Sequence, residues 1–188
     1  MQQDKVAQLV AHLFRHQAGK MIAALVRLFG FEHVNLAEDV VQDTFITAYQ
    51  QWHFAALPEQ PEAWLMTVAR NKAINAVKRG ARIKNFDPSL FLGEEADATG
   101  RYIDAAFAEK EITDSQLQLL FLCCHPQLPE KSQLILTLQV LCGFSVDEIA
   151  NALFMQKEAV KKALYRAKED IREEGLHTHT NFIMFSEQ

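Results

Sequence analysis

The sequence is poor in the two residues that most often interrupt helices, with only 7 glycines and 5 prolines in 188 residues. It also lacks the alternation of apolar and polar residues that half-buried strands require, and its apolar residues recur at helical spacing instead. Hydrophobic residues make up 49% of the chain, enough to bury a substantial core. These features predict an all-α protein.

Cysteine is scarce as well. The 3 cysteines include the adjacent pair Cys123 and Cys124, so they are not a disulfide framework, and they favour a reducing compartment. The N-terminus lacks the residue order of a signal peptide, and the longest apolar run, MIAALVRLFGF, is interrupted by Arg27 and too short to span a bilayer. We therefore expect a soluble, cytoplasmic protein that does not use a membrane.

Catalytic and metal-binding patterns are also missing. The adjacent cysteines do not have the spacing of zinc ligands, and no phosphate-binding glycine loop or nucleophile constellation is present. Asp39 and Asp43, one helical turn apart, could hold Mg²⁺ in an all-α enzyme, but a second carboxylate cluster to face them is not evident. We expect no enzyme, no metal and no cofactor, with a magnesium-dependent enzyme as a remote alternative.

What the sequence does contain is an uneven distribution of charge. The net charge of -5 does not suggest nucleic-acid binding by the chain as a whole. Residues 64–86, however, include six basic residues and no acidic one, and residues 157–168 include five basic residues and one acidic residue. Two basic stripes on an acidic chain indicate two separate contacts with nucleic acid.

Helical periodicity predicts helices at about residues 4–29, 35–52, 62–82, 114–125, 129–142, 145–153 and 156–174. Asn35 and Glu38 have capping-box spacing, Pro129 suits a first helical position, and Gly143 suits a helix end. An acidic, turn-rich stretch separates two groups of helices. We expect two small helical domains, residues 1–83 and 113–175, joined by a linker at 84–112 and followed by a tail at 176–188 of unknown role.

The stretch SVDEIANALFMQKEAVKKALYRAK is typical of a helix-turn-helix, with Ser145 and Glu148 as a capping box before the short helix. The apolar positions of the longer helix, Val160, Leu164 and Ala167, step by 4 and 3 and predict its buried face. The other side of the helix carries Lys157, Glu158, Lys161, Lys162, Tyr165 and Arg166. The alternative is a solvated charged helix that only closes a bundle, since charge runs usually lie in solvent.

The other basic stripe lies on the helix at 62–82. Its polar residues step by 4, 3 and 4 and are Asn71, Asn75, Lys78 and Arg82, with Lys72 and Arg79 beside them. Asparagine can hydrogen-bond to base edges, and the cations can neutralise phosphates. The preceding loop contains His53 and Phe54 and suits an unstacked base, whereas the flanking Trp52 and Trp64 are expected in the core.

LAEDVVQDTFITAYQQW followed by PEAWLMTVARNKAINAVKR resembles region 2 of the extracytoplasmic-function (ECF) sigma factors of bacterial RNA polymerase. LPEKSQLILTLQVLCGFSVDEIANALFMQKEAVKKALYRAKEDIR resembles region 4 of the same family, and the resemblance extends over roughly residues 5–175. QLQLLFLCCHPQL is similar to a subgroup with an additional C-terminal tetratricopeptide-like domain, for which these 188 residues leave no room.

This resemblance implies a non-enzymatic sigma factor whose partners are bacterial core RNA polymerase and promoter DNA, with an anti-sigma factor as a further candidate. Region 2 would bind the polymerase clamp through Glu38, Asp39, Gln42 and Asp43. It would melt and read the -10 promoter element through His53, Phe54, Asn71, Lys72, Asn75, Lys78, Arg79 and Arg82.

Region 4 would dock on the polymerase flap and read the -35 element. The residues implied for this are Lys157, Glu158, Lys161, Lys162, Tyr165, Arg166 and Lys168. Two residues depart from the family pattern. Asn75 stands where the family often has aspartate, which affects how the -10 element would be read. Ala163 stands where the family often has arginine, which would remove one phosphate contact at the -35 element. A stand-alone helix-turn-helix regulator remains the alternative function, and a compact state with the two domains packed together remains open.

Overall fold

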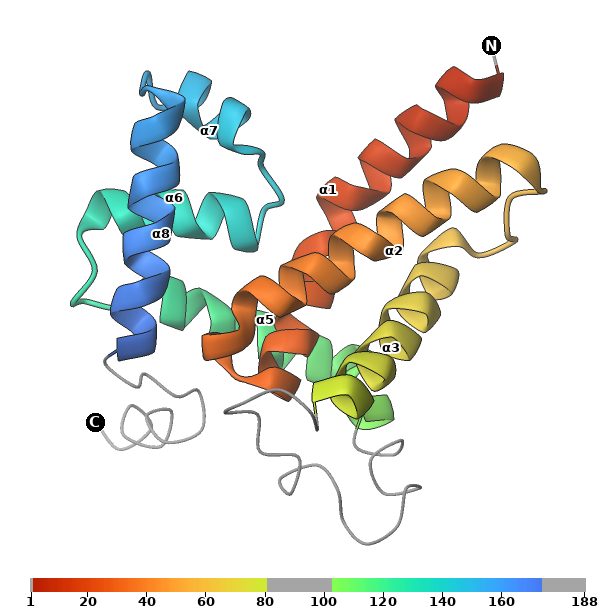
Figure 1. Ribbon diagram of the computed structural model, residues 1–188, viewed down its shortest axis with the longest axis horizontal. Coiled ribbons are helices and arrows are strands. Elements are labelled where there is room, and N and C mark those ends of the chain that lie inside the picture. Colours follow the sequence, from red (N-terminus) through yellow and green to blue (C-terminus); the bar gives the residue numbers. More distant parts are fainter. Residues whose placement is uncertain (1, 81–102, 174–188) are drawn as a thin grey trace, which may run out of the picture.

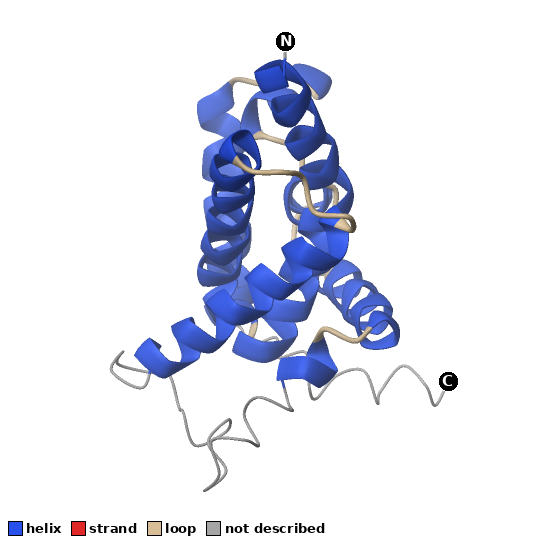
Figure 2. Cartoon of the chain, turned by 90° about the vertical axis from the view of Figure 1, so that its right-hand side faces the viewer, coloured by secondary structure: helices blue, strands red, loops and turns tan. Residues whose placement is uncertain are grey.

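The computed structural model describes residues 2–80 and 103–173, and all regular structure in these two stretches is helical (Figures 1 and 2). The prediction of an all-α protein is confirmed. Arg82, most of the expected linker at 84–112 and the expected tail at 176–188 lie outside the described residues.

The first group of helices consists of α1 (Gln2–Phe29), the short 3-10 helix η1 (Phe31–His33), α2 (Val34–Phe54) and α3 (Pro61–Gly80). Figure 1 shows α2 lying between α1 and α3, both of which pack against it. The face of α2 that periodicity predicts to be apolar is buried, and its members are Val41, Phe45, Ala48 and Trp52. Gly30 makes the tight turn after α1 with a φ of 81°, a left-handed conformation that glycine adopts without steric cost.

The expected capping box of α2 is wrong. The helix begins at Val34 after His33, which makes no side-chain capping bond, so Asn35 lies within the helix. The Glu38 carboxylate accepts hydrogen bonds from Lys168 instead of turning back to the start of its own helix. The contact with Lys168 of α8 therefore takes the place of a capping bond within α2.

The second group consists of α5 (Glu109–Cys123), α6 (Glu130–Val140), α7 (Val146–Ala152) and α8 (Lys157–Glu173). The helix α5 begins ahead of the expected residue 114, and residues 103–106 are also helical, with Ile103 fully buried. Pro129 precedes α6 as its N-cap and is not the first helical residue. Gly143 follows α6 with a φ of 68°, as a residue that ends a helix often does.

The helix-turn-helix at α7 and α8 forms as the sequence predicts. The Ser145 hydroxyl accepts a hydrogen bond from the Glu148 amide, and the Glu148 carboxylate accepts one from the Ser145 amide, which completes the capping box. The predicted face of α8 is buried, from Val160 to Ile171. The turn contains no glycine, and Phe154 takes the left-handed conformation there with a φ of 52° and a side chain that is 98% exposed.

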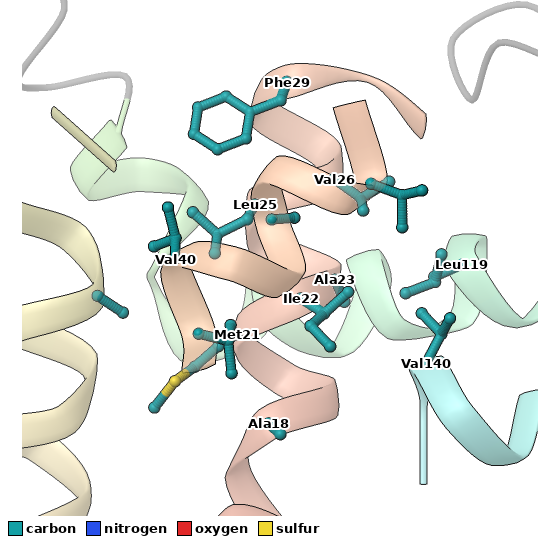
Figure 3. Packing of buried hydrophobic residues seen from close by; sticks show 14 of the residues in the cluster. Ala18, Met21, Ile22, Ala23, Leu25, Val26, Phe29, Val40, Leu119 and Val140 are labelled. Atoms are coloured by element: carbon teal, nitrogen blue, oxygen red, sulfur yellow. The ribbon is translucent and has the colours of Figure 1, made fainter. Parts of the chain in front are cut away.

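One hydrophobic core runs through both groups of helices. Figure 3 shows Ile22 and Val26 of α1 near Leu119 of α5 and Val140 of α6. In addition, α8 packs against η1, which leads into α2. The two groups are therefore docked on each other through α1 and the start of α2.

Candidate nucleic-acid and polymerase interfaces

The first half of α8 presents its polar side chains to solvent. Lys157, Glu158, Lys161, Lys162, Tyr165 and Arg166 are all exposed. Two of the lysines are held by neighbouring carboxylates, Lys157 by Asp147 and Lys161 by Glu158, with nitrogen–oxygen distances of 2.8 Å in both cases. The Glu158 hydrogen bond also raises the pKa of Lys161. Exposed ion pairs of this kind are weak, so phosphate oxygens can replace the carboxylates.

Lys168, from the same expected -35 set, is placed differently. Its side chain is only 10% exposed, and its Nζ donates to both carboxylate oxygens of Glu38 at 2.8 Å. The Glu38 side chain, from the expected polymerase-binding set, is only 16% exposed. In this conformation each of the two charges satisfies the other, and neither is available to a phosphate or to a partner protein.

The polar stripe of α3 faces outward because the opposite side of the helix is buried through Leu65, Ala69 and Ala73. Asn71 and Asn75 are exposed, and Lys72 is partly buried. Arg70 donates to the Asn71 side chain at 3.2 Å and pairs with Asp104, which connects α3 to the segment before α5. Lys78 and Arg79 belong to α3, but their side chains, like the whole of Arg82, lie outside the described part of the chain.

The end of α2 and the loop after it form a small aromatic and apolar surface. Phe54 is 89% exposed and meets the ring of His53 at a centroid distance of 5.0 Å. Trp52 is buried and Trp64 partly buried, with 5.3 Å between their centroids, so both belong to the packing as expected. Beside the loop lies a groove of about 540 Å³ lined by Lys5, Val6, Leu9, Trp52, Ala55, Ala56 and Leu57. An exposed ring beside a mostly apolar groove with one lysine can accept an unstacked base and its phosphate.

The outer face of α2 combines acidic and apolar side chains. Asp39, Gln42 and Asp43 are exposed, and Ile46 and Tyr49 continue the same face at 53% and 44% exposure. Acidic groups repel phosphate, whereas exposed apolar and aromatic side chains are typical of the centre of a protein–protein interface. Sequence reasoning missed Ile46 and Tyr49, although their helical spacing from Gln42 and Asp43 was a signal for them.

A further exposed apolar surface lies on α5 and α6 and was also missed. Leu117, Leu120 and Phe121 share one side of α5, and Leu134 of α6 is exposed as well. Exposed apolar side chains that gather on one side of a helix are typical of a surface that another protein covers.

Metal ligands do not gather in the described stretches, where no group of three or more His, Cys, Asp or Glu side chains could hold an ion. Burial raises the pKa of Cys123 to about 12, which keeps this core thiol protonated and unreactive. Among residues 2–80 and 103–173, no helix combines the length and the apolarity needed to cross a membrane.

Two family models match the chain in the places where these surfaces lie. Sigma-70 region 2 matches residues 13–83, and Sigma-70, region 4 matches residues 118–171. The helices α2 and α3 with the loop between them, and the helix-turn-helix of α7 and α8, are therefore those of a sigma factor.

Relatives identify the branch of sigma factors. The ECF RNA polymerase sigma-E factor of Haemophilus influenzae is 30% identical over 134 residues, which are 71% of either chain. That of Salmonella typhimurium strain LT2 is 28% identical over 134 residues, 71% of this chain and 70% of the relative. An uncharacterised protein of Rhizobium meliloti is 32% identical over 159 residues, and the match spans 85% of this chain but only 37% of that longer protein. The chain belongs to the ECF RNA polymerase sigma factors, a family of transcription initiation factors and not of enzymes.

Proposed function

We propose that this chain binds bacterial core RNA polymerase and directs promoter-specific transcription initiation by reading the -10 and -35 elements. The proposal rests on three surfaces in one chain. Two are the outward-facing polar sides of α3 and α8, which belong to different groups of helices, and the third is the acidic and apolar face of α2, which suits a protein partner. A stand-alone regulator would use the helix-turn-helix but would have no use for the surfaces of α2 and α3.

Reading of the -35 element is assigned to α8. In a helix-turn-helix the second helix enters the major groove with its N-terminal residues against the base edges. The exposed residues of α8 lie mostly in its N-terminal half. The lysine amines there can bind phosphates, and Tyr165 and Arg166 can contact the wall of the groove. The short α7, fixed by its capping box, sets the angle at which α8 is presented.

Reading and melting of the -10 element is assigned to α3 and the loop before it. The exposed amides of Asn71 and Asn75 can hydrogen-bond to bases, and Lys72 and the basic residues that follow can bind phosphates. Phe54 and the adjacent groove offer a place for a base that has left the stack.

Polymerase binding is assigned to two surfaces. The exposed face of α2, with Asp39, Gln42 and Asp43 followed by Ile46 and Tyr49, would meet the clamp. The apolar side of α5 would meet the flap. These tasks place the chain in the cytoplasm, where polymerase and DNA are found, and a regulator that covers the α2 face would act as an anti-sigma factor.

Charge reversal on α2 tests the proposal. The double variant Asp39→Lys and Asp43→Lys should lose core-polymerase binding in a pull-down and lose run-off transcription from a promoter library. The matched control, Asp170→Lys with Glu173→Lys, makes the same change in net charge on exposed residues at the end of α8, where cations suit the helix dipole. Normal initiation by the α2 variant would refute the clamp assignment.

Binding of the free chain to promoter duplex distinguishes a sigma factor from a stand-alone regulator. Each DNA surface makes few phosphate contacts, so the free chain should bind promoter duplex weakly and with steep salt dependence. Attachment to polymerase raises the effective concentration of both surfaces at a promoter. Tight, salt-resistant binding of the free chain to duplex DNA, without any binding to polymerase, would support the regulator instead.

A further inference from the structure

We propose that Phe154, in the turn between α7 and α8, reads a thymine of the -35 element through an apolar contact with the methyl group of that base. This role rests on the proposed sigma function. It adds a specificity-determining residue to the polar side chains of α8 that are already assigned to the -35 element.

The ring of Phe154 lies almost entirely in solvent. Its side chain is 98% exposed, and no other large hydrophobic side chain in residues 2–80 and 103–173 is exposed to this extent. Single exposed apolar side chains are common on protein surfaces, so exposure alone does not assign a role. It does show that the ring contributes nothing to the packing of the chain.

The backbone at Phe154 supplies a second, independent observation. Its φ is 52°, and among the described residues no other residue except glycine has a positive φ. This left-handed conformation crowds the Cβ atom of an L-residue, and the turn of a helix-turn-helix often holds glycine for that reason. Strained residues gather at sites that bind other molecules. A bulky ring that strains the turn without packing in the chain therefore points to a contact outside the chain.

The turn that carries the ring is fixed on both sides. The Met155 amide donates to the Ala150 carbonyl at 2.8 Å, and the Leu153 amide donates to the Ile149 carbonyl at 3.0 Å. The side chains of Leu153 and Met155 both pack against the core. The backbone of Phe154 therefore has one defined course, and little conformational freedom remains to be lost when the ring meets a partner.

The position of the turn places the ring at the edge of the expected DNA contact. Figure 1 shows the turn at the end of the helix-turn-helix that is remote from α5. Lys157, the first residue of α8, is three positions after Phe154, so their Cα atoms are at most about 11 Å apart. In a helix-turn-helix the first helix crosses the DNA backbone and the second enters the major groove, which is about 12 Å wide. Phe154 joins these two helices and lies within one groove width of the residues expected on the bases.

The chemistry of a phenyl ring selects thymine among the four bases. The ring has no hydrogen-bond donor or acceptor of its own, so it cannot read the polar pattern of a base edge. Thymine alone presents a methyl group in the major groove, and apolar side chains such as phenylalanine contact it there. Burial of one such group contributes roughly fourfold to affinity. This preference is additional to the phosphate contacts of the lysines, which carry no sequence information.

Deoxyuridine tests the proposal, because it pairs as thymidine does but lacks the methyl group. The wild-type holoenzyme first selects its promoter from a library by run-off transcription. Each thymine in and beside the -35 element is then replaced in turn by deoxyuridine. We expect one replacement to lower the affinity of the holoenzyme for the promoter duplex roughly fourfold. Replacement of a thymine well upstream of the element is the control and should have no effect.

Variants at Phe154 assign the methyl contact to the ring. Asparagine and glycine both tolerate the left-handed backbone, so Phe154→Asn and Phe154→Gly remove the ring and keep the turn. Both should bind the thymine and deoxyuridine promoters equally. Phe154→Tyr retains the ring and is the matched control, with the roughly fourfold preference maintained. The salt dependence of binding should be unchanged in Phe154→Asn and reduced in Lys157→Ala, since only the lysine neutralises phosphate.

The outcomes separate this role from the sigma function. The role of Phe154 would be overturned by a -35 element without any position sensitive to deoxyuridine, or by a thymine preference that persists in both ring-free variants. Weaker binding of Phe154→Asn to core polymerase without DNA would overturn it as well, because the ring would then contact the polymerase. In all these cases the wild type still initiates transcription, and the proposed function stands. A wild type that neither binds polymerase nor initiates would overturn both.

Discussion

Replacement of Ile149 by alanine should strongly destabilise the helix-turn-helix unit. Ile149 lies on α7, is fully buried and belongs to the core that α7 shares with α8. The substitution removes three carbon atoms, for which burial contributes roughly 2.4 kcal/mol at about 0.8 kcal/mol each. The cavity that remains brings the expected loss to about 3–4 kcal/mol, a large part of the total stability of a small protein.

Urea unfolding followed by far-UV circular dichroism measures this loss, and the same change at Ile46 is its control. Ile46 is 53% exposed on α2, so Ile46→Ala should change the stability by less than about 0.5 kcal/mol while weakening polymerase binding. A loss below about 1 kcal/mol for Ile149→Ala would refute the packing of α7 on α8. Equal losses for both variants would show that burial does not distinguish the two positions.

Three further predictions concern α7, its turn and α5. Phe154→Gly should leave stability unchanged or raise it by up to about 1 kcal/mol in urea unfolding, because the exposed ring contributes no packing and the left-handed backbone suits glycine. Hydrogen bonds from the Ser145 amide, then from Arg15 and the Ser145 hydroxyl, lower the pKa of Glu148 to about 2. The stabilisation by this carboxylate is therefore fully present above pH 4.5 and is lost as the pH falls toward 2, so the difference in Tm between wild type and Glu148→Gln should shrink over that range. Phe121→Ser should leave the melting temperature nearly unchanged and reduce polymerase binding, and a large fall in Tm would instead show that this ring is part of the core.

The sequence was sufficient for features that depend on neighbours three or four residues apart. The buried faces of α2 and α8, the capping box of Ser145 and Glu148, and the exposed basic half of α8 follow from helical periodicity, and the structure has them. The same local logic failed at Asn35 and Glu38, because α2 begins earlier than the capping-box spacing suggests. Helical periodicity also missed Ile46 and Tyr49, because it assigns apolar residues to the buried face of a helix and these two are exposed.

By itself, the sequence determined the all-α class and the buried faces of α2 and α8, because the 3.6-residue period fixes which side of a helix is apolar. Only the tertiary structure decided how the two groups of helices meet. The pairing of Glu38 with Lys168 and the contact of Gly19 with Leu141 join residues far apart in the chain. No local period relates such residues, so their contact depends on how the packed surfaces of α1, α6 and α8 fit together.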